Sequence, residues 1–97
     1  MKKINCIELK LMPSNGRKSF NGKATVLKGD GLYFLKSYNT IVCSVDEDGK
    51  VTKYFQPTTK TTFCHLNSFL EQFTDIDNAQ YKNLEIDPNR PELLVAF

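Results

Sequence analysis

The sequence predicts an α+β domain in which an antiparallel sheet of about four to five strands carries one amphipathic helix, near residues 61–73, packed across it. Short runs of alternating apolar and polar residues recur through the first half of the chain, as in strands with one buried face. Asn-Gly and Asp-Gly pairs between these runs favour tight turns. A later segment has apolar residues at helical spacing. With 97 residues, we expect one domain over residues 1–97.

Two strands and a basic loop are expected before residue 32. INCIELKLM alternates polar and apolar residues until Pro13 ends the strand. The following PSNGRKSFNGK contains two Asn-Gly pairs, so we expect an exposed, mobile loop in which Arg17, Lys18 and Lys23 surround Phe20. KATVLKGDG then predicts a second short strand that ends in a turn.

GLYFLKSYNTIVCSV is the most strand-like segment of the chain. Apolar residues alternate on both sides of residues 36–39, which form either a bulge in one long strand or a short connection between two strands. DEDGK predicts an acidic turn with Gly49 where a left-handed backbone is needed, and VTKYF follows as the partner strand. We therefore expect an antiparallel hairpin that ends at Pro57.

An amphipathic helix is expected from about residue 61 to residue 73. Its apolar stripe consists of Phe63, Leu66, Phe69, Leu70 and Phe73. Thr61 or Thr62 is expected to cap the first turn, because a threonine hydroxyl accepts a hydrogen bond from an unpaired N–H group. His65 lies one residue off the stripe, at its border. Beyond the helix, YKNLEI and ELLVAF are apolar patches separated by DPNRP, and ELLVAF is expected to form an edge strand.

Charge is unevenly distributed along the chain. Residues 1–60 hold eleven Lys/Arg and five Asp/Glu, a net charge of +6, whereas residues 61–97 hold two and six, a net charge of −4. The asymmetry indicates either two faces of opposite sign or an acidic tail resting on a basic sheet. The overall charge of +2 argues against a DNA mimic, and the chain is less basic than dedicated nucleic-acid-binding domains.

Cysteine usage and hydropathy predict an intracellular protein. Cys6, Cys43 and Cys64 are far apart and odd in number, so we expect buried free thiols and no disulfide framework. No C-x-x-C or H-x-x-x-H pair is present to bind zinc, and we expect neither a metal nor a cofactor. No apolar run approaches the roughly 18 residues of a membrane span, and the start lacks the apolar stretch of a secretion signal.

The residues predict a binding protein and not an enzyme. Nucleophilic catalysis needs a base within hydrogen-bond reach of the nucleophile, but Cys64 and His65 are consecutive helix residues that diverge by about 100°. No phosphate-binding glycine loop is present. The alternatives for His65 are a structural hydrogen bond, partner recognition, and metal binding or catalysis, of which we expect the structural role.

Two charged surfaces are expected. A basic and aromatic surface on one side of the sheet would contact phosphates and stack on bases, although a solvated lysine-rich surface accounts for the same residues. Its members are Arg17, Lys18, Phe20, Lys23, Lys36, Lys53 and Tyr54. The expected acidic surface consists of Glu71, Asp75, Asp77, Glu85 and Asp87.

Two stretches, LKSYNTIVCSV and TTFCHLNSFL, carry a family resemblance. Together they resemble a family of small domains of unknown function from bacteriophages and related mobile elements, which pairs a Leu-x-Ser-Tyr-x-Thr-x-Val strand motif with a Thr-Thr-x-x-His-x-x-x-Phe-Leu helix motif. The resemblance covers residues 31–73. YFQPTTKTT departs from the family by being longer before the helix. The motif positions are Ser37, Tyr38, Thr40, Thr61, Thr62 and His65, and we expect them to form a polar strand–helix junction.

The resemblance implies a phage- or mobile-element-encoded protein in the cytoplasm of a bacterial host. The expected function is non-enzymatic binding of a protein partner, most concretely inhibition of a host defence system by an anti-CRISPR-like protein that binds a Cas effector. The alternative is a single-stranded nucleic-acid-binding accessory protein. ELLVAF pairs either within the chain or with a second copy, which would give a dimer through an edge strand.

Overall fold

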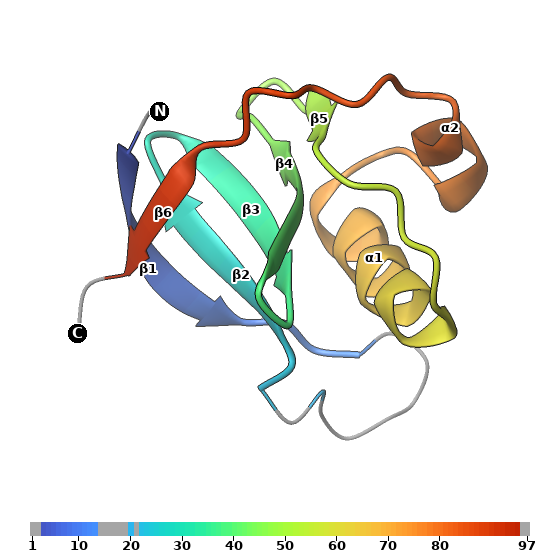
Figure 1. Cartoon of the computed structure of the whole chain (residues 1–97), viewed down its shortest axis with the longest axis horizontal. Helices are drawn as coiled ribbons and strands as arrows, with labels where there is room; N and C mark the ends of the chain where they lie inside the picture. Colours follow the sequence, from blue (N-terminus) through green and yellow to red (C-terminus); the bar gives the residue numbers. More distant parts are fainter. Residues whose placement is uncertain (1–2, 14–19, 21, 96–97) are drawn as a thin grey trace.

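Residues 3–13, 20 and 22–95, which the computed structural model describes, form a six-stranded sheet and two helices, and the longer helix lies across one face of the sheet (Figure 1). The strand order is β5-β4-β3-β2-β1-β6, and all neighbouring strands are antiparallel except β1 and β6. The elements are β1 (Lys3–Lys10), β2 (Ala24–Gly29), β3 (Leu32–Ser37), β4 (Thr40–Val45), β5 (Val51–Lys53), α1 (Lys60–Phe73), α2 (Asn78–Lys82) and β6 (Glu92–Val95).

Tight turns join β2, β3 and β4. Between β2 and β3, Asp30 and Gly31 have φ values of +56° and +75°, the pattern of a type I′ hairpin turn. Between β3 and β4, Ser37 pairs with Thr40 across a two-residue connection. Residues 36–39 therefore hold a short connection between two strands. A bulge also occurs, but it lies just before this turn, where the register of β3 and β4 shifts.

Strand β1 contributes to two apolar clusters, one on each face of the sheet. Ile4 and Cys6 belong to the cluster on the face away from α1, whereas Leu9, and Leu11 just after the strand, pack into the cluster under α1. Because side chains alternate along a strand, one continuous strand can change its buried face half-way along. Ile7 points toward the α1 face where the helix does not cover it, and this residue is 55% exposed.

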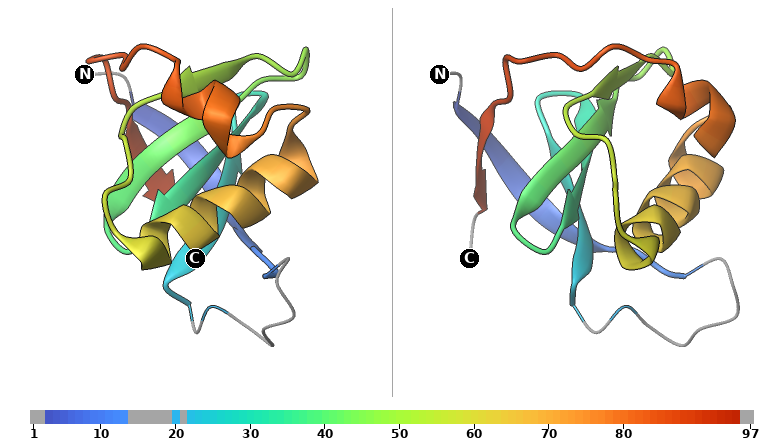
Figure 2. Two further views of the ribbon diagram at one scale, coloured as in Figure 1. Left: turned by 90° about the vertical axis from the view of Figure 1, so that its right-hand side faces the viewer. Right: turned by 45° about the vertical axis from the view of Figure 1, so that its right-hand side comes forward.

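The cluster away from α1 is enclosed by the sheet itself. Side chains from β4 and from β6 pack against this cluster from its two sides, so the sheet curves around it, as the two views of Figure 2 show. Its buried members are Ile4, Cys6, Leu27 and Phe34, and the partly buried residues packed on them are Leu32, Ile41, Tyr54, Leu93 and Val95.

The C-terminal segment connects the two edges of the sheet. Ile86 forms a parallel bridge with Lys53 of β5, and the chain then crosses to the opposite edge, where β6 lies parallel to β1. In Figure 2 this orange-red segment passes along the top of the molecule. On the way, the Arg90 guanidinium donates a hydrogen bond of 3.3 Å to the Tyr54 carbonyl.

Helix α1 starts earlier than the sequence suggests. Its N-cap is Thr59, whose hydroxyl accepts a hydrogen bond of 3.3 Å from the Thr62 N–H, so the expectation that Thr61 or Thr62 caps the helix was wrong. Four threonines lie within five residues here, and each has the hydroxyl that a cap requires. Residue type therefore did not select among them.

The buried face of α1 is also rotated from the expected stripe. Leu66, Phe69 and Leu70 are buried as expected, but Phe63 and Phe73 are only half-buried. The rotation brings polar residues into the interface with the sheet, and these residues are Thr62, His65 and Ser68.

The described chain has more elements than expected, with six strands and two helices in place of four to five strands and one helix. Helix α2 was missed because its five residues make less than two turns; a capping box between Asp77 and Gln80 begins it. β6 is an edge strand as expected, but it is parallel to β1, so the sheet is mostly and not wholly antiparallel. Neither helix of the described chain is long and apolar enough to cross a membrane.

Candidate recognition site at the Tyr38 end of the sheet

A buried strand–helix contact joins the end of β3 to α1. Ser37 Oγ and His65 Nδ1 lie 2.8 Å apart, although 28 residues separate them in the sequence. The Phe20 ring packs edge-on against the imidazole, with ring centroids 4.7 Å apart. The Tyr38 ring lies over the same imidazole at 5.8 Å. Ser37, His65 and Phe20 are buried and form a supporting cluster for the tyrosine.

Tyr38 is the exposed member of this group. The residue is 51% exposed, and its φ of +53° lies in the left-handed region, which costs a residue with a side chain about 1–2 kcal/mol. Its N–H donates a hydrogen bond of 2.7 Å to the Lys23 carbonyl, which fixes the turn to the start of β2. A large aromatic ring is thus held on the surface at a backbone position that glycine adopts without strain.

The threonines of the expected polar junction lie around this contact. Thr40 pairs with Ser37 and is half-buried as the first residue of β4. Thr62 is buried, with its hydroxyl 3.0 Å from that of Thr59, and Thr61 is exposed on the first turn of α1. The serine, the tyrosine and the histidine of the expected junction therefore meet, whereas its threonines serve the turn and the start of the helix.

Three lysines lie at the same end of the sheet as the Tyr38 turn. Lys10 pairs with Thr25, which in turn pairs with Lys36, so the three side chains form one row on the face away from α1. The backbones of the two lysines are about 10 Å apart, which is two strand spacings. Lys23 is exposed, and its carbonyl accepts the hydrogen bond from the tyrosine. We call the surface formed by Lys10, Lys23, Lys36 and Tyr38 the Tyr38 end.

Acidic residues gather at the opposite end of the same strands. The β2–β3 and β4–β5 turns lie there, away from the β3–β4 turn (Figure 1). Consecutive hairpin turns alternate between the two ends of a sheet. The acidic β2–β3 and β4–β5 turns therefore lie at one end, and the β3–β4 turn with its nearby lysines lies at the other. Four carboxylates line a shallow hollow of about 330 Å³ there, together with Gly31 and Leu32. They belong to Asp30, Asp46, Glu47 and Asp48.

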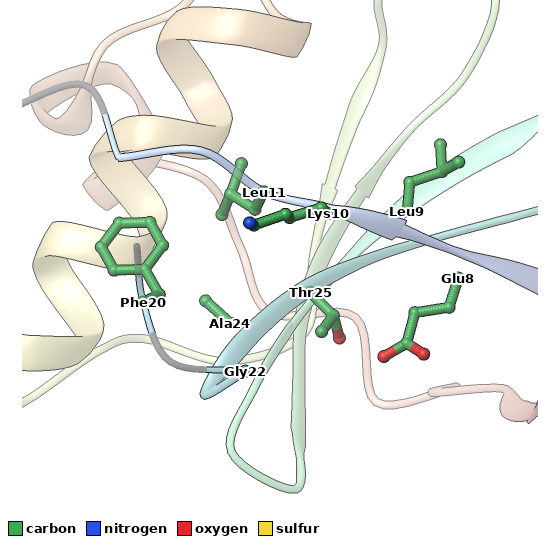
Figure 3. Close-up of a pocket in the computed structure, with 8 residues that line it drawn as sticks. All are labelled: Glu8, Leu9, Lys10, Leu11, Phe20, Gly22, Ala24 and Thr25. Atoms are coloured by element: carbon green, nitrogen blue, oxygen red, sulfur yellow. The ribbon is translucent and has the colours of Figure 1, made fainter. Parts of the chain in front are cut away.

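A hollow of about 350 Å³ lies beside the Tyr38 end (Figure 3). This volume is at the lower end of the range for ligand pockets, about 300–1,000 Å³. Phe20 and Leu11 provide apolar walls, while Glu8, Lys10 and Thr25 bring polar atoms to the rim. The other lining residues are Leu9, Gly22 and Ala24. Phe20 touches His65, so the wall of the hollow and the support of Tyr38 are continuous.

The expected basic and aromatic surface is present only in part. Lys23 and Lys36 reach the surface, but Phe20 is 5% exposed and faces the helix, so the expectation that it stacks on a base was wrong. Tyr54 is half-buried against the cluster on the other side of the sheet. Two further members lie outside the described residues, namely Arg17 and Lys18.

Lys53 was also wrongly placed on that surface, because this residue is 4% exposed. Its ammonium donates hydrogen bonds of 3.2 Å to the carbonyls of Lys82, the last residue of α2, and Leu84, and it lies over the Tyr81 ring. Burial lowers the pKa of this ammonium. Lys53 therefore satisfies the carbonyl groups at the end of a helix instead of contacting a partner.

The expected acidic surface is spread over several elements. Glu71 and Asp77 line one hollow between α1 and α2, and Asp77 also caps α2. The Asp87 carboxylate accepts a hydrogen bond from a backbone N–H two residues later. Asp75 and Glu85 are exposed. Two of the five carboxylates therefore stabilise local backbone.

The environment of two cysteines weakens them as nucleophiles. Cys6 and Cys43 are buried free thiols, as expected, and Cys64 is half-buried on α1. Burial raises the pKa of both buried thiols, so they stay protonated near neutral pH and lack the thiolate that attacks substrates. Among the residues that the structure describes, no three His, Cys, Asp or Glu side chains come together as metal ligands.

The whole Tyr38 end lies within a segment that a protein-family model matches. That model is DUF8033, a family of unknown function, and it matches residues 7–86. The chain belongs to this family. The matched segment contains both helices and every strand except β6, and it includes β1 only from residue 7 onward. No curated protein and no solved structure matches the chain. Membership in a family of unknown function is thus confirmed, while a phage source stays a prediction.

Sequence reasoning missed Lys10 and the hollow. Both depend on the pairing of β1 with β2, which sets Lys10 opposite Thr25. A two-residue hairpin would have fixed that register from the sequence, but the connection between these strands is much longer. The surface position of Lys36 was easier to predict, because the short β3–β4 turn fixes which residues of β4 pair with the end of β3.

Proposed function

We propose that this protein is a non-enzymatic binding protein that recognises its partner through the Tyr38 end. The observation that carries the proposal is Tyr38 itself, half-exposed at a φ of +53° on top of a buried supporting cluster. A strained residue persists where the surrounding structure holds it, and such residues gather at ligand-binding and active sites.

The construction of the site favours recognition over catalysis. His65 Nδ1 is engaged by Ser37 inside the protein, so the histidine fits a role in positioning the tyrosine. A rigid aromatic side chain offers a large contact area at a small entropic cost, which is why tyrosine is enriched where proteins bind one another. The lysines at this end of the sheet add attraction for an anionic partner.

The narrower form of this proposal is a phage-encoded inhibitor of a host defence effector in the bacterial cytoplasm, which occupies the effector and blocks it. The two motif stretches that resemble small phage domains support this form, because they contain Tyr38 and His65. A positively charged end suits either the guide RNA or an acidic protein surface of such an effector.

Affinity capture from a bacterial lysate with the tagged full chain tests the proposal. We expect a stoichiometric partner, identified by mass spectrometry for protein and by gel staining for nucleic acid. Tyr38→Ala should lose this partner, whereas Lys50→Ala, at the opposite end of the sheet, should retain it. Recovery of no stoichiometric partner, or equal recovery by Tyr38→Ala, would overturn the proposal.

A further inference from the structure

We infer that the partner recognised by the Tyr38 end is a single-stranded nucleic acid. This inference rests on the proposed function and names the class of ligand for the same surface. Proteins that bind single strands without strong sequence preference combine cationic side chains along the backbone path with aromatic rings on which bases stack. The Tyr38 end places both kinds of group on one end of a curved sheet.

The lysines supply contacts for phosphates. Lys10 and Lys36 lie in one row with Thr25 between them, and the threonine hydroxyl is a further hydrogen-bond donor for a phosphate oxygen. Lys23 lies two residues before Thr25, next to the turn, and its carbonyl accepts the hydrogen bond from the Tyr38 N–H. The phosphate path inferred from this placement runs along the row and past the tyrosine.

Tyr38 and the hollow supply contacts for bases. The exposed tyrosine ring is fixed by its turn and by the imidazole beneath it, so little side-chain entropy is lost when a base stacks on it. The hollow next to this support is lined by Phe20, and Lys10 and Thr25 bring polar atoms to its rim that can form hydrogen bonds with an adjacent base. Glu8 at its far rim repels phosphate, and its carboxylate accepts hydrogen bonds from base amino groups.

The geometry favours a single strand over a duplex or an acidic protein. Stacking on Tyr38 and entry into the hollow both require bases that are free of a paired helix. The carboxylates at the opposite end of the sheet repel phosphates there and orient a strand toward the Tyr38 end. An acidic protein would also use the lysines and could pack on the ring, but a threonine hydroxyl between two lysines is a set of donors that suits phosphate oxygens.

Fluorescence anisotropy tests this inference, with the full chain and labelled oligo(dT) and oligo(U). Each oligonucleotide has about 20 nucleotides, which exceeds the site size of one small domain. We expect binding that weakens as salt rises. Tyr38→Ala should weaken binding about tenfold, since one stacked base is lost, and Tyr38→Phe should bind like wild type.

The lysine row is tested by its salt dependence. The Lys10→Ala/Lys36→Ala pair should reduce the slope of log K against log salt by about 1.4, because each phosphate contact on a single strand contributes about 0.7. The Lys28→Ala/Lys50→Ala pair makes the same change in net charge at the acidic end and should leave the slope near that of wild type.

Three results would overturn the inference: no binding of either oligonucleotide, equal slope changes for the two lysine pairs, or wild-type affinity for Tyr38→Ala. Capture from nuclease-treated lysate distinguishes this failure from failure of the proposed function. A protein partner that survives nuclease and is lost with Tyr38→Ala would retain the proposed function and refute the nucleic-acid ligand. Loss of the captured partner on nuclease treatment would support both.

Discussion

Tyr38 and Asp30 are the two residues other than glycine that have positive φ in the described part of the chain. Asp30 is followed by glycine in a turn of the kind that aspartate tolerates, so its conformation needs no further explanation. Tyrosine lacks the short polar side chain that lets aspartate form a local hydrogen bond in this conformation. At residue scale, the backbone strain and the exposed ring of Tyr38 are the two observations on which its proposed binding role rests.

Tyr38→Gly is predicted to stabilise the protein relative to Tyr38→Ala by about 1 kcal/mol, because both variants lack the ring and only glycine relieves the left-handed backbone. Urea denaturation of both variants measures this difference in the free energy of unfolding. Both should lose the captured partner equally. A Tyr38→Gly variant less stable than Tyr38→Ala would show that the turn is not strained.

Ser37→Ala is predicted to reduce the free energy of unfolding by about 1–3 kcal/mol, because it removes the hydroxyl that pairs with a buried ring nitrogen of His65. The double variant Ser37→Ala/His65→Phe should lose less than the sum of the two single variants, since an apolar ring no longer needs that partner. Strict additivity in urea denaturation would show that the contact contributes nothing.

At the scale of elements, the start of α1 depends on one threonine out of four. Thr59→Ala is predicted to lower the free energy of unfolding by about 1 kcal/mol, because its hydroxyl accepts a hydrogen bond from an otherwise unpaired N–H of the first turn. Thr61→Ala, at an exposed position two residues later, should change it by less than about 0.5 kcal/mol. Thermal and urea unfolding of both variants would contradict the cap assignment if their losses were equal.

The elements that could be predicted are long enough for their apolar residues to repeat several times at the spacing of a strand or a helix. The hairpins follow from alternation closed by residues that accept a left-handed backbone, and α1 follows from an apolar stripe that lasts several turns. α2 is shorter than two turns, so its period is not visible, and its one local signal is the Asp77–Gln80 capping box. Whether β6 is parallel or antiparallel depends on the strand that it reaches. The segment between α2 and β6 determines this, and the residues of ELLVAF do not.

The candidate site was predictable only where neighbours are close in sequence or share a short turn. The meeting of Ser37, Tyr38 and His65 was expected, because the end of β3 was placed correctly and the start of α1 to within one residue. Burial of Lys53 and Phe20 was not, since each fills a space that other elements create. A lysine and a phenylalanine next to turn residues look like surface groups until the carbonyls of α2 and the imidazole of α1 are in place.

At the scale of the whole molecule, stability is predicted to fall as pH rises above about 9. Burial raises the pKa values of Cys43 and Tyr81 above their ordinary values of 9.0 and 10.0, so the folded state keeps protons that the unfolded chain releases. Each such proton lowers the free energy of unfolding by up to about 1.4 kcal/mol per pH unit. The lowered pKa of Lys53 makes the protein more stable as pH rises toward 10.5, the ordinary pKa of lysine. This effect offsets the proton of only one of the two groups.

Urea denaturation between about pH 8 and pH 10 measures this slope. A Cys43→Ala variant should be less stable at every pH, because it leaves a cavity, but its stability should fall less steeply since one ionising group is gone. Equal pH slopes for wild type and Cys43→Ala over this range would contradict the raised pKa of Cys43.

The segment after α2 has a consequence for how the molecule opens. Release of the four residues of β6 would withdraw Leu93 and Val95 from the cluster enclosed by the sheet, and it would leave the eight-residue β1 without a neighbour on that side. A long unpaired strand with apolar residues beside it is a template for edge-to-edge aggregation. Local fraying of β6, well before global unfolding, is therefore the step at which crowded or heated solutions of this protein would begin to form intermolecular β-structure.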